Sequence, residues 1–287
     1  MINLVMHPST QTQLEHFIAR PAHAVLLTGP AGIGKTALAE AMAAEILGRS
    51  LESYPYYQMV RPDGLSISIE AVRQLQKFLM LKTTGEQPIR RIVVVEHAHT
   101  MTTEAQNAFL KLLEEPPADT LLILTANSAR SLMPTILSRA QQISINAPAE
   151  SQLQGLLAAS NKDAQAQKQA YSLSAGLPGL LVALLNDDEE HPLLQSVAEA
   201  KSLLQKTPFE RLAAVDLFSK QRDTSLALVS ALERIAQAGL AGAGAKQDLA
   251  RIKQWHRLRK AALKAREALE RSANAKLTLA HLFLHLQ

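Results

Sequence analysis

The sequence predicts an α/β domain, built on a parallel sheet flanked by helices, followed by a purely helical remainder. Three observations predict it. Short apolar runs alternate with helical patterns in the first half of the chain, which is typical of βα units. A glycine-rich loop stands between one of these runs and a strongly helix-forming segment. After Pro148 the strand-like runs vanish, and Ala, Leu, Gln and Lys dominate.

Four apolar runs are the candidate strands: Ala24–Thr28, Ile92–Val95, Leu121–Thr125 and Ile143–Ile145. Their hydrophobicity is nearly continuous instead of alternating. Strands of this kind occur in parallel sheets, where helices cover both faces. We therefore expect a sheet with helices on both of its sides.

One helix of the first half has clear signals at both ends. It is expected to begin at Thr103, because Gln106 stands three residues later, as in a capping box, and apolar residues then recur at helical spacing. Pro116 and Pro117 end it, since the residue before a proline is disfavoured in the α region.

Two segments of the helical remainder have the composition of breaks. Asn186–Pro192 concentrates acidic residues and a helix breaker without an apolar residue, and it is the best candidate for a linker. Gly239–Gly244 reads GLAGAG and predicts a loop between helices of the last domain.

The composition excludes several classes of protein. The 287 residues are 47% hydrophobic and 20% charged, as in a soluble globular chain. The absence of cysteine excludes a disulfide framework, a thiol nucleophile and cysteine-ligated zinc. The longest apolar stretches are far shorter than a membrane span, and the first residues lack the features of a signal peptide. We therefore expect a cytoplasmic protein with no membrane partner.

Positive charge is concentrated late in the chain. Residues 1–150 carry 12 Lys and Arg against 13 Asp and Glu, whereas residues 151–287 carry 18 against 13. Within the second half, Lys246–Lys276 holds ten basic residues and three acidic ones. A helix of this composition could contact phosphates or an acidic partner. The alternative, a solvated helix face, is slightly favoured.

The glycine-rich loop carries the strongest functional signal. Gly29–Thr36 reads GPAGIGKT, a full match to the phosphate-binding pattern G-x-x-x-x-G-K-[ST] between a strand and a helix. Glycines let the backbone turn its N–H groups and the helix N-terminus toward a phosphate. Lys35 would place its charge near the β- and γ-phosphates, and the Thr36 hydroxyl would face Mg²⁺. The loop therefore predicts a nucleotide site.

Proteins with this loop usually carry an acidic residue at the end of a second strand. Here that strand ends VVVEHAHTM, so Glu96 is the first polar residue after it and is expected to order Mg²⁺. His97 stands where a hydrolytic enzyme often keeps a glutamate that polarises water. We favour the simpler interpretation, in which His97 caps the end of the strand.

Four segments carry a resemblance to a known family: GPAGIGKTALAEAMA, RPDGLSISIEAVRQLQKFL, RIVVVEHAHTMTTEAQNAFLKLLEEPPADTLLILTAN and MPTILSRAQQISI. In order and spacing they resemble the AAA+ core of bacterial clamp-loader subunits, over about residues 10–185. Within that family the sequence is most similar to the delta-prime type of DNA polymerase III. The ATP-hydrolysing gamma/tau type is the near alternative.

Departures from the hydrolytic pattern favour the delta-prime type. The aspartate-glutamate pair of gamma-type subunits corresponds to Glu96 and His97 here, and Gly179 stands near the place of the sensor arginine of active lids. Family members commonly hold four zinc-binding cysteines between the loop and the second strand. This chain has no cysteine, so no zinc is expected and Arg49–Val60 must fold without it.

The resemblance implies roles for further residues. Arg139 corresponds to the family's arginine finger, which reaches the γ-phosphate of a neighbouring subunit; the alternative is a surface ion pair. Asn127 lies near the position called sensor one. The cofactor would be ATP or ADP with Mg²⁺. The expected nucleotide contacts are Gly29, Pro30, Ala31, Gly32, Ile33, Gly34, Lys35, Thr36, Ala37 and Asn127, and the expected Mg²⁺ ligands are Thr36 and Glu96.

The resemblance also implies three domains: an AAA+ nucleotide-binding domain of residues 1–147, a helical lid of residues 148–190 and a helical collar of residues 191–287. The chain would bind nucleotide, hydrolyse little ATP alone and present Arg139 in trans. With other clamp-loader subunits in a hetero-oligomeric ring, it would help to load a sliding clamp onto primer-template DNA. Two alternatives stay open: an autonomous AAA+ ATPase, which His97 and Gly179 disfavour, and a nucleotide-locked scaffold.

Overall fold

The computed structural model describes residues 4–64, 66–188, 191–271 and 273–286. The chain divides into two compact units, Met1–Gln152 and Leu153–Gln287. The first unit contains the glycine-rich loop. The subdivision of the chain into three domains stays a prediction.

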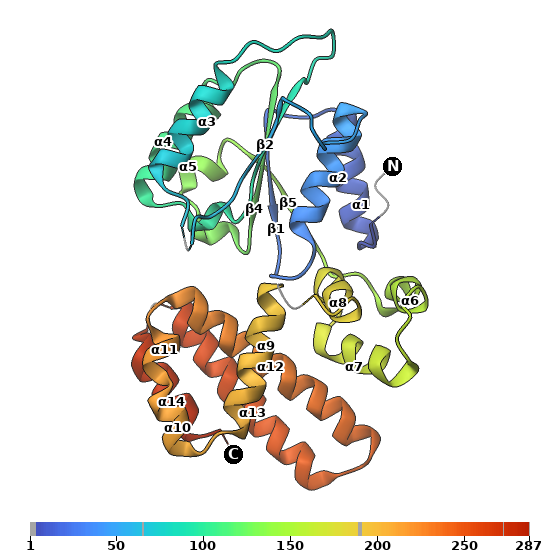
Figure 1. Ribbon diagram of the computed structural model, residues 1–287, viewed down its shortest axis with the longest axis vertical. Coiled ribbons are helices and arrows are strands. Elements are labelled where there is room, and N and C mark those ends of the chain that lie inside the picture. The colour runs from blue at the N-terminus through green and yellow to red at the C-terminus, as the bar shows by residue number, and fades with distance from the viewer. Residues whose placement is uncertain (1–3, 65, 189–190, 272, 287) are drawn as a thin grey trace. The chain divides into compact units, whose positions relative to one another are not determined.

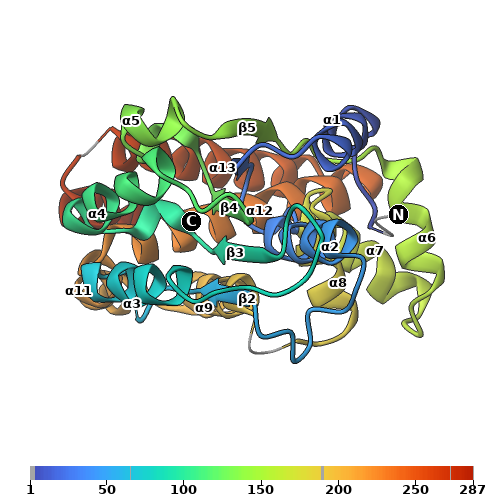
Figure 2. The same ribbon diagram turned by 90° about the horizontal axis from the view of Figure 1, so that it is seen from above.

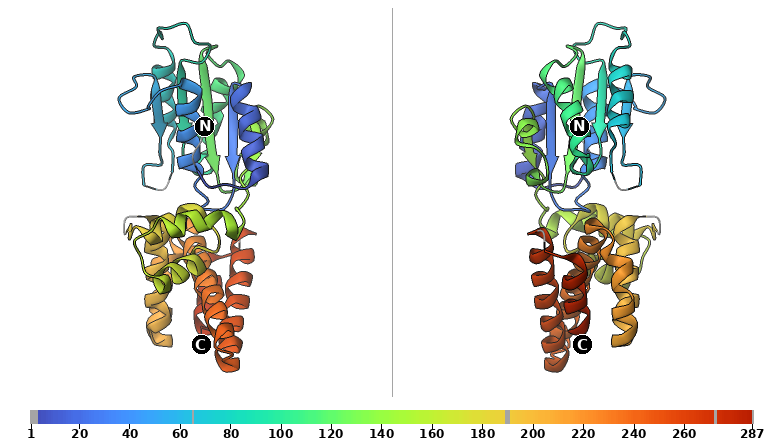
Figure 3. Two further views of the ribbon diagram at one scale, coloured as in Figure 1. Left: turned by 90° about the vertical axis from the view of Figure 1, so that its right-hand side faces the viewer. Right: turned by 90° about the vertical axis from the view of Figure 1, so that its left-hand side faces the viewer.

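A five-stranded sheet forms the centre of the first unit. Its strands are β1 (Ala24–Thr28), β2 (Tyr57–Val60), β3 (Arg91–Val95), β4 (Thr120–Ala126) and β5 (Gln141–Ser144). They are all parallel and follow the order β2-β3-β4-β1-β5, so β2 and β5 are the edges (Figure 2). Figure 3 shows the strands side by side. The four predicted strands are confirmed, and β2 is an addition that the apolar runs do not reveal.

Helices cover both faces of this sheet. They are α1 (Pro8–Ala19), α2 (Lys35–Leu47), α3 (Ile69–Leu79), α4 (Thr103–Glu114) and α5 (Pro134–Leu137), with short 3-10 turns η1 (Ala98–Thr100) and η2 (Ala129–Ser131). Figure 1 shows α1 and α2 on one face and α3, α4 and α5 on the other. Leu26, Val93 and Leu122, from the three central strands, are fully buried and belong to the core under the second group of helices. The expectation of a sheet covered on both sides is confirmed.

Helix α4 begins at Thr103, as predicted, but the residue that caps it is Thr102, so the predicted capping box is wrong. Thr102 is the N-terminal cap, and its hydroxyl accepts a hydrogen bond from the N–H of Ala105. Gln106 does not complete a capping box, because its buried side chain donates to the carbonyl of Met101 and accepts from the N–H of Met133. This amide therefore joins α4 to the segment that leads into α5. The prediction that the two prolines end the helix is confirmed, since α4 ends at Glu114.

Aromatic side chains organise the segment before β2, for which the family pattern suggests zinc. The rings of Tyr54 and Tyr56 meet edge to face with centroids 5.6 Å apart, and the guanidinium of Arg49 lies 5.1 Å from the Tyr54 ring. The hydroxyl of Tyr54 donates to the carbonyl of Arg90 at 2.7 Å, next to the start of β3. These contacts hold the segment against the sheet without a cysteine.

A buried arginine satisfies carbonyl groups at the C-terminal end of α3. Arg91, the first residue of β3, is 1% exposed and donates to the carbonyl of Leu79 at 2.6 Å and to that of Leu81. Its guanidinium also lies over the ring of Phe78, 5.4 Å from the centroid. Carbonyl groups at a helix C-terminus lack partners within the helix and attract positive charge. Arg91 thus couples the end of α3 to the sheet.

The second unit is entirely helical in the residues that the structure describes, as the loss of strand-like runs after Pro148 predicts. Its helices are α7 (Ala164–Ser174), α8 (Pro178–Leu185), α9 (Pro192–Gln205), α10 (Pro208–Ala213), α11 (Val215–Ser219), α12 (Arg222–Ala245), α13 (Leu249–Glu270) and α14 (Ala275–Leu284), while α6 (Glu150–Ala158) crosses the boundary between the units. The expected linker Asn186–Pro192 lies between α8 and α9, except that Pro192 is the first residue of α9; residues 189 and 190 lie outside the described residues. Gly179 lies in the first turn of α8.

The predicted loop at Gly239–Gly244 is wrong, because α12 continues through it to Ala245. The glycine at 239 serves helix packing instead. A Cβ there would lie 2.3 Å from the indole of Trp255 on α13, so only glycine lets the two helices approach this closely. The turn between α12 and α13 follows Ala245, with Gln247 in the left-handed region and Asp248 as the N-terminal cap of α13.

Helix α12 is long and apolar enough, by length and composition alone, to cross a membrane. Its composition has a simpler cause in this fold. Leu228, Val229, Leu232 and Ala236 are fully buried in the core of the second unit. These four apolar residues of α12 are therefore accounted for by packing against its helical neighbours.

The second unit also contains a buried arginine at a helix end. Arg211 of α10 donates from Nε to the carbonyl of Leu203 at 3.1 Å and from Nη2 to that of Leu204 at 2.9 Å. Its third group, Nη1, donates to the carbonyl of Leu286, beyond α14. Arg211 thereby ties the end of α9 to the end of the described chain.

Candidate functional site

The glycine-rich loop joins β1 to α2. Gly34 is the N-terminal cap of α2 with a φ of 94°, and the described side chains provide no cap to this helix. A helix start of this kind offers its first N–H groups to an anion. Gly29 leaves no room for a side chain, because a Cβ there would lie 2.9 Å from the carbonyl oxygen of Ile145. The backbone of the loop thus has the form that phosphate binding requires.

The other predicted contacts of the loop lie between and beyond these glycines. Pro30, Ala31, Gly32 and Ile33 form the turn, in which the N–H of Ile33 donates to the carbonyl of Pro30 at 3.3 Å. The side chain of Ile33 is buried, whereas Ala37 is exposed on the first turn of α2. Ile33 therefore anchors the loop.

The ammonium of Lys35 lies against the backbone of the glycine-rich loop. Its Nζ donates to the carbonyls of Gly29 and Pro30, at 2.8 and 3.0 Å, and to Oδ1 of Asn127 at 3.1 Å. Burial of the ammonium lowers the pKa of Lys35 to about 8, although the negative charge of Glu96 opposes this shift. The site therefore contains a buried cation whose protein partners, apart from Glu96, are neutral oxygens.

Thr36 and Glu96 meet at the carboxyl ends of the strands. The Thr36 hydroxyl donates to Oε1 of Glu96 at 2.6 Å, which brings the two predicted Mg²⁺ ligands together. A hydroxyl and a carboxylate are hard oxygen donors, the kind that Mg²⁺ prefers, and they lie beside an ammonium that suits phosphate. These residues fit Mg²⁺ together with a nucleotide.

Asn127 links the loop to a histidine that the sequence analysis did not single out. Because Oδ1 of Asn127 accepts from an ammonium, its Nδ2 is the donor in the 3.2 Å contact with Nε2 of His99. The pattern HAH after β3 was a usable signal for a polar cluster at this strand end. Lys35, Asn127 and His99 form one continuous chain of hydrogen bonds.

His97 has a special backbone conformation. It takes a φ of 51° as the N-terminal cap residue of η1, and its N–H donates to Oγ1 of Thr125 at 3.0 Å. Its ring lies 5.6 Å from that of His99. His97 thus ends the strand through its backbone, and the described structure gives its side chain no capping bond to η1.

Arg61 is a residue of the site that the sequence analysis missed. Its Nε lies 3.1 Å from Oε2 of Glu96, the carboxylate oxygen that Thr36 does not use. Arg61 directly follows β2, a strand that the apolar runs did not reveal. Without that strand, nothing in the sequence brings position 61 to position 96.

Arg139 lies near the end of α5, apart from the loop in the described contacts. Its Nη2 pairs with Oε1 of Glu114, the last residue of α4, at 2.9 Å. Its Nη1 donates to the carbonyl of Thr135 and to the hydroxyl of Ser138. The side chain is about one third exposed, so the guanidinium is held at the surface of the first unit.

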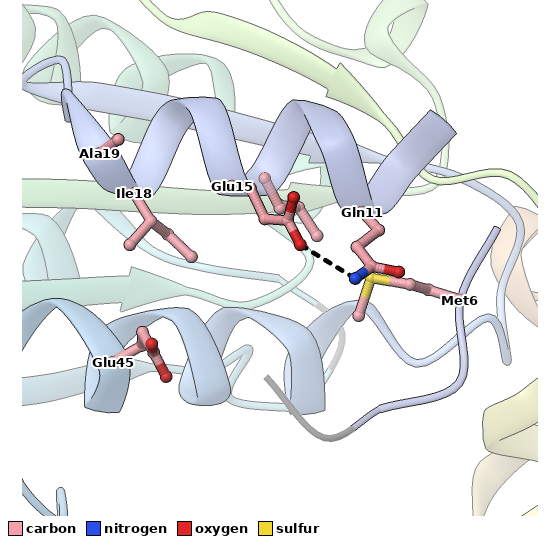
Figure 4. Close-up of a pocket in the computed structure, with 7 residues that line it drawn as sticks. Met6, Gln11, Glu15, Ile18, Ala19 and Glu45 are labelled. Atoms are coloured by element: carbon pink, nitrogen blue, oxygen red, sulfur yellow. Dashed lines mark hydrogen bonds between the residues drawn. The ribbon is translucent and has the colours of Figure 1, made fainter. Parts of the chain in front are cut away.

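A separate cavity of about 280 Å³ lies between α1 and α2. Figure 4 shows Gln11 and Glu15 of α1, which share a hydrogen bond of 2.9 Å, and Glu45 of α2 at its wall. The lining is otherwise mostly apolar and includes no residue of the glycine-rich loop. Two carboxylates repel an anionic ligand, so this cavity does not extend the phosphate site.

The parallel sheet, the glycine-rich loop and the acidic strand end together define a P-loop protein of the AAA+ class. Among families, the one described as "DNA polymerase III, delta subunit" matches residues 7–149. The DNA polymerase III subunit delta' of Pseudomonas aeruginosa is 34% identical over 209 residues, which cover 66% of this chain and 63% of that protein. The corresponding subunit of Bacillus subtilis is 32% identical, over 43% of this chain and 42% of that protein. The chain belongs to the delta-prime family of DNA polymerase III clamp-loader subunits.

The matches do not extend over the whole of these relatives. The chain spans about three fifths of the Pseudomonas protein and less than half of the Bacillus protein. Among solved structures, a gamma subunit-related protein of Thermotoga maritima is 19% identical, with a TM-score of 0.49, over 96% of this chain and 98% of that one.

Proposed function

We propose that this chain is a cytoplasmic clamp-loader subunit that binds ATP or ADP with Mg²⁺ in its glycine-rich loop. The observation that carries the proposal is the group of Lys35, Thr36 and Glu96 around a helix start without a side-chain cap. Lys35 would exchange its bonds to loop carbonyls for phosphate oxygens. Bound Mg²⁺ would neutralise phosphate charge beside Thr36 and Glu96.

The proposal includes little or no ATP hydrolysis by the chain alone. A hydrolytic site must orient a water molecule and compensate the charge that develops on the phosphate. His97 provides no carboxylate for the water, and the guanidinium of Arg139 is bound to Glu114. The chain would instead contribute Arg139 to the nucleotide site of a neighbouring subunit in a hetero-oligomeric ring.

Exposed apolar side chains on the second unit support assembly with other subunits. Phe209, Leu217 and Leu277, from α10, α11 and α14, are 82%, 64% and 71% exposed. Large apolar groups that stay exposed in one chain are typical of a protein contact surface. The assembled ring would act on a sliding clamp and on primer-template DNA.

Lys35→Ala tests the nucleotide site. Loss of the charged hydrogen bonds to phosphate should weaken binding of a fluorescent ADP by about 10- to 100-fold or more. Equilibrium titration measures this, with the exposed Lys82→Ala as the matched control.

In the native protein, the affinity for ADP should fall as the pH rises above about 8, because Lys35 loses the proton that attracts phosphate. Lys35→Arg, which stays charged, should lose that pH dependence. Equal affinity of native protein and Lys35→Ala would refute the site.

Arg139→Ala tests the role in trans. In a reconstituted clamp loader it should leave assembly and the subunit's own nucleotide affinity intact while lowering the ATPase stimulated by clamp and DNA. The loss should be partial, because only the site that faces this subunit loses an arginine, although such fingers contribute about 10³ to 10⁵ in rate. Arg130→Ala, an exposed arginine of η2, is the control.

Glu114→Ala separates the two interpretations of Arg139. If Arg139 acts only through its pair with Glu114, both variants should lower the ATPase equally. If it acts on a neighbouring phosphate, Glu114→Ala should keep the stimulated rate. Normal turnover with Arg139→Ala would reduce Arg139 to a surface charge.

A further inference from the structure

The carboxylate of Glu96 has both of its oxygens engaged by the protein. Oε1 accepts from the Thr36 hydroxyl at 2.6 Å, and Oε2 accepts from Nε of Arg61 at 3.1 Å. The Glu96 side chain is 19% exposed, whereas that of Arg61 is 64% exposed. The pair therefore has one face in the site and one face in solvent.

The backbone sets this pair by strand register. Val60 pairs with Val95 at the ends of β2 and β3, and the N–H of Glu96 donates to the carbonyl of Val60 at 2.9 Å. Arg61 and Glu96 directly follow these two neighbouring strands. After Arg61 the chain is fastened again, since Ile67 exchanges backbone hydrogen bonds of 3.1 Å with Thr100 and Thr102. The arginine is thus held beside the carboxylate from both directions.

Glu96 is shared by two cations. It lies close enough to Lys35 to raise the pKa of that ammonium against the effect of burial, and it pairs directly with Arg61. A divalent cation at Glu96 would add charge where two positive groups already face one carboxylate. Mg²⁺ and the guanidinium would thus compete for the negative charge of the same carboxylate, Mg²⁺ from the side of Thr36 and Arg61 from the side of Oε2.

We propose that Arg61 competes with Mg²⁺ for Glu96, so that nucleotide binding to this subunit depends only weakly on Mg²⁺. The proposal rests on the nucleotide site proposed above and adds a property that the loop motif does not imply. Arg61 is a positioning residue here, because it acts through Glu96. In the absence of the metal, it keeps the carboxylate from repelling the phosphates.

The experiment compares nucleotide affinity with and without Mg²⁺. The dissociation constant of fluorescent ADP is measured in EDTA and in saturating Mg²⁺ for the native protein, Arg61→Ala, Arg61→Lys and Arg73→Ala. Arg73 is the matched control, because it is 62% exposed and pairs with Glu70, away from the loop. Circular dichroism of each variant checks that the fold is intact.

Arg61→Ala should increase the ratio of the dissociation constant in EDTA to the dissociation constant in Mg²⁺ by about two- to fivefold. This is the range for breaking an exposed ion pair. The Mg²⁺ concentration at half-maximal effect should fall by a similar factor. Arg61→Lys, which keeps the charge, should lie between Arg61→Ala and the native protein, and Arg73→Ala should equal the native protein.

An unchanged ratio in Arg61→Ala, with nucleotide binding intact, would overturn the competition and leave the proposed function in place. A larger ratio in Arg73→Ala as well would overturn it too, since the effect would then reflect net charge and not the contact with Glu96. Absence of nucleotide binding by the native protein in both buffers would overturn the proposed nucleotide site, and the role of Arg61 with it.

Discussion

The two compact units place their charged side chains differently. In the first unit, Lys35, Glu96 and Asn127 lie at the carboxyl ends of parallel strands and contact one another or a shared neighbour. In the second unit, the basic residues of α13 lie along an exposed face, as with Lys253, Arg257, Lys260 and Lys264. Parallel strands all end at one edge of their sheet, so the fold itself gathers residues from distant sequence positions. A helix distributes its charged residues along its length, so the helical unit does not gather them at one place.

The units nevertheless share one structural device. Arg91 in the first and Arg211 in the second are buried arginines that donate to carbonyls at the end of a helix. Each replaces the solvent that would otherwise satisfy those carbonyls. The comparison therefore predicts equal dependence on these arginines despite the different architectures.

Arg91→Met and Arg211→Met should have the largest effects. Each removes two or more buried hydrogen bonds to carbonyls and leaves those acceptors without a partner, at about 3 kcal/mol or more of unfolding free energy. The chain has a single tryptophan, Trp255 on α13, so its fluorescence reports on the second unit. In urea, Arg211→Met should shift the fluorescence transition more than Arg91→Met does. Nucleotide binding should respond in the opposite order.

If Trp255 fluorescence and nucleotide binding are lost at the same urea concentration in both variants, this comparison is wrong, because the two units then unfold as one. Lys82→Met, an exposed substitution in the first unit, should move neither signal and provides the baseline.

A smaller effect is expected at the contact between α12 and α13. Gly239→Ala places a methyl group against Trp255 and should lower the unfolding free energy by about 1–3 kcal/mol, as overpacking does. Gly242→Ala, three residues along the same helix, meets nothing within 4 Å and should raise it by about 0.5–1 kcal/mol. Thermal unfolding followed by Trp255 fluorescence measures both. Stabilisation by both variants would mean that the two helices lie farther apart at residue 239.

The sequence predicts the interior of the first unit well, because burial there is uniform. The strands β1, β3 and β4 are almost completely buried, so a continuous apolar run marks each of them. The edge strand β2 reads YQMV and is only partly buried, so neither alternation nor continuity marks it. Because β2 was not predicted, the position of Arg61 beside Glu96 could not be predicted either.

Two further differences have local causes. Composition alone predicts a loop for a glycine-rich stretch. The glycine at 239 is needed instead because Trp255, on the next helix, leaves no room for a side chain. The capping box at Thr103 failed because Gln106 is engaged by Met133, a partner from another element. By contrast, the loop Gly29–Thr36 and the acidic strand end at Glu96 can both be found from local signals, and in the structure Thr36 contacts Glu96.

The two bonds between α4 and α5 have a mechanical consequence. Gln106 bonds the N–H of Met133 at one end of the short helix, and Glu114 holds Arg139 near the other. With both attachments in place, α5 is restrained from rotating about either of them. A phosphate that draws Arg139 away from Glu114 would release one attachment and leave a hinge at Gln106. Engagement of the arginine would then let α5 rotate relative to α4, the first α-helix after Glu96 in the chain.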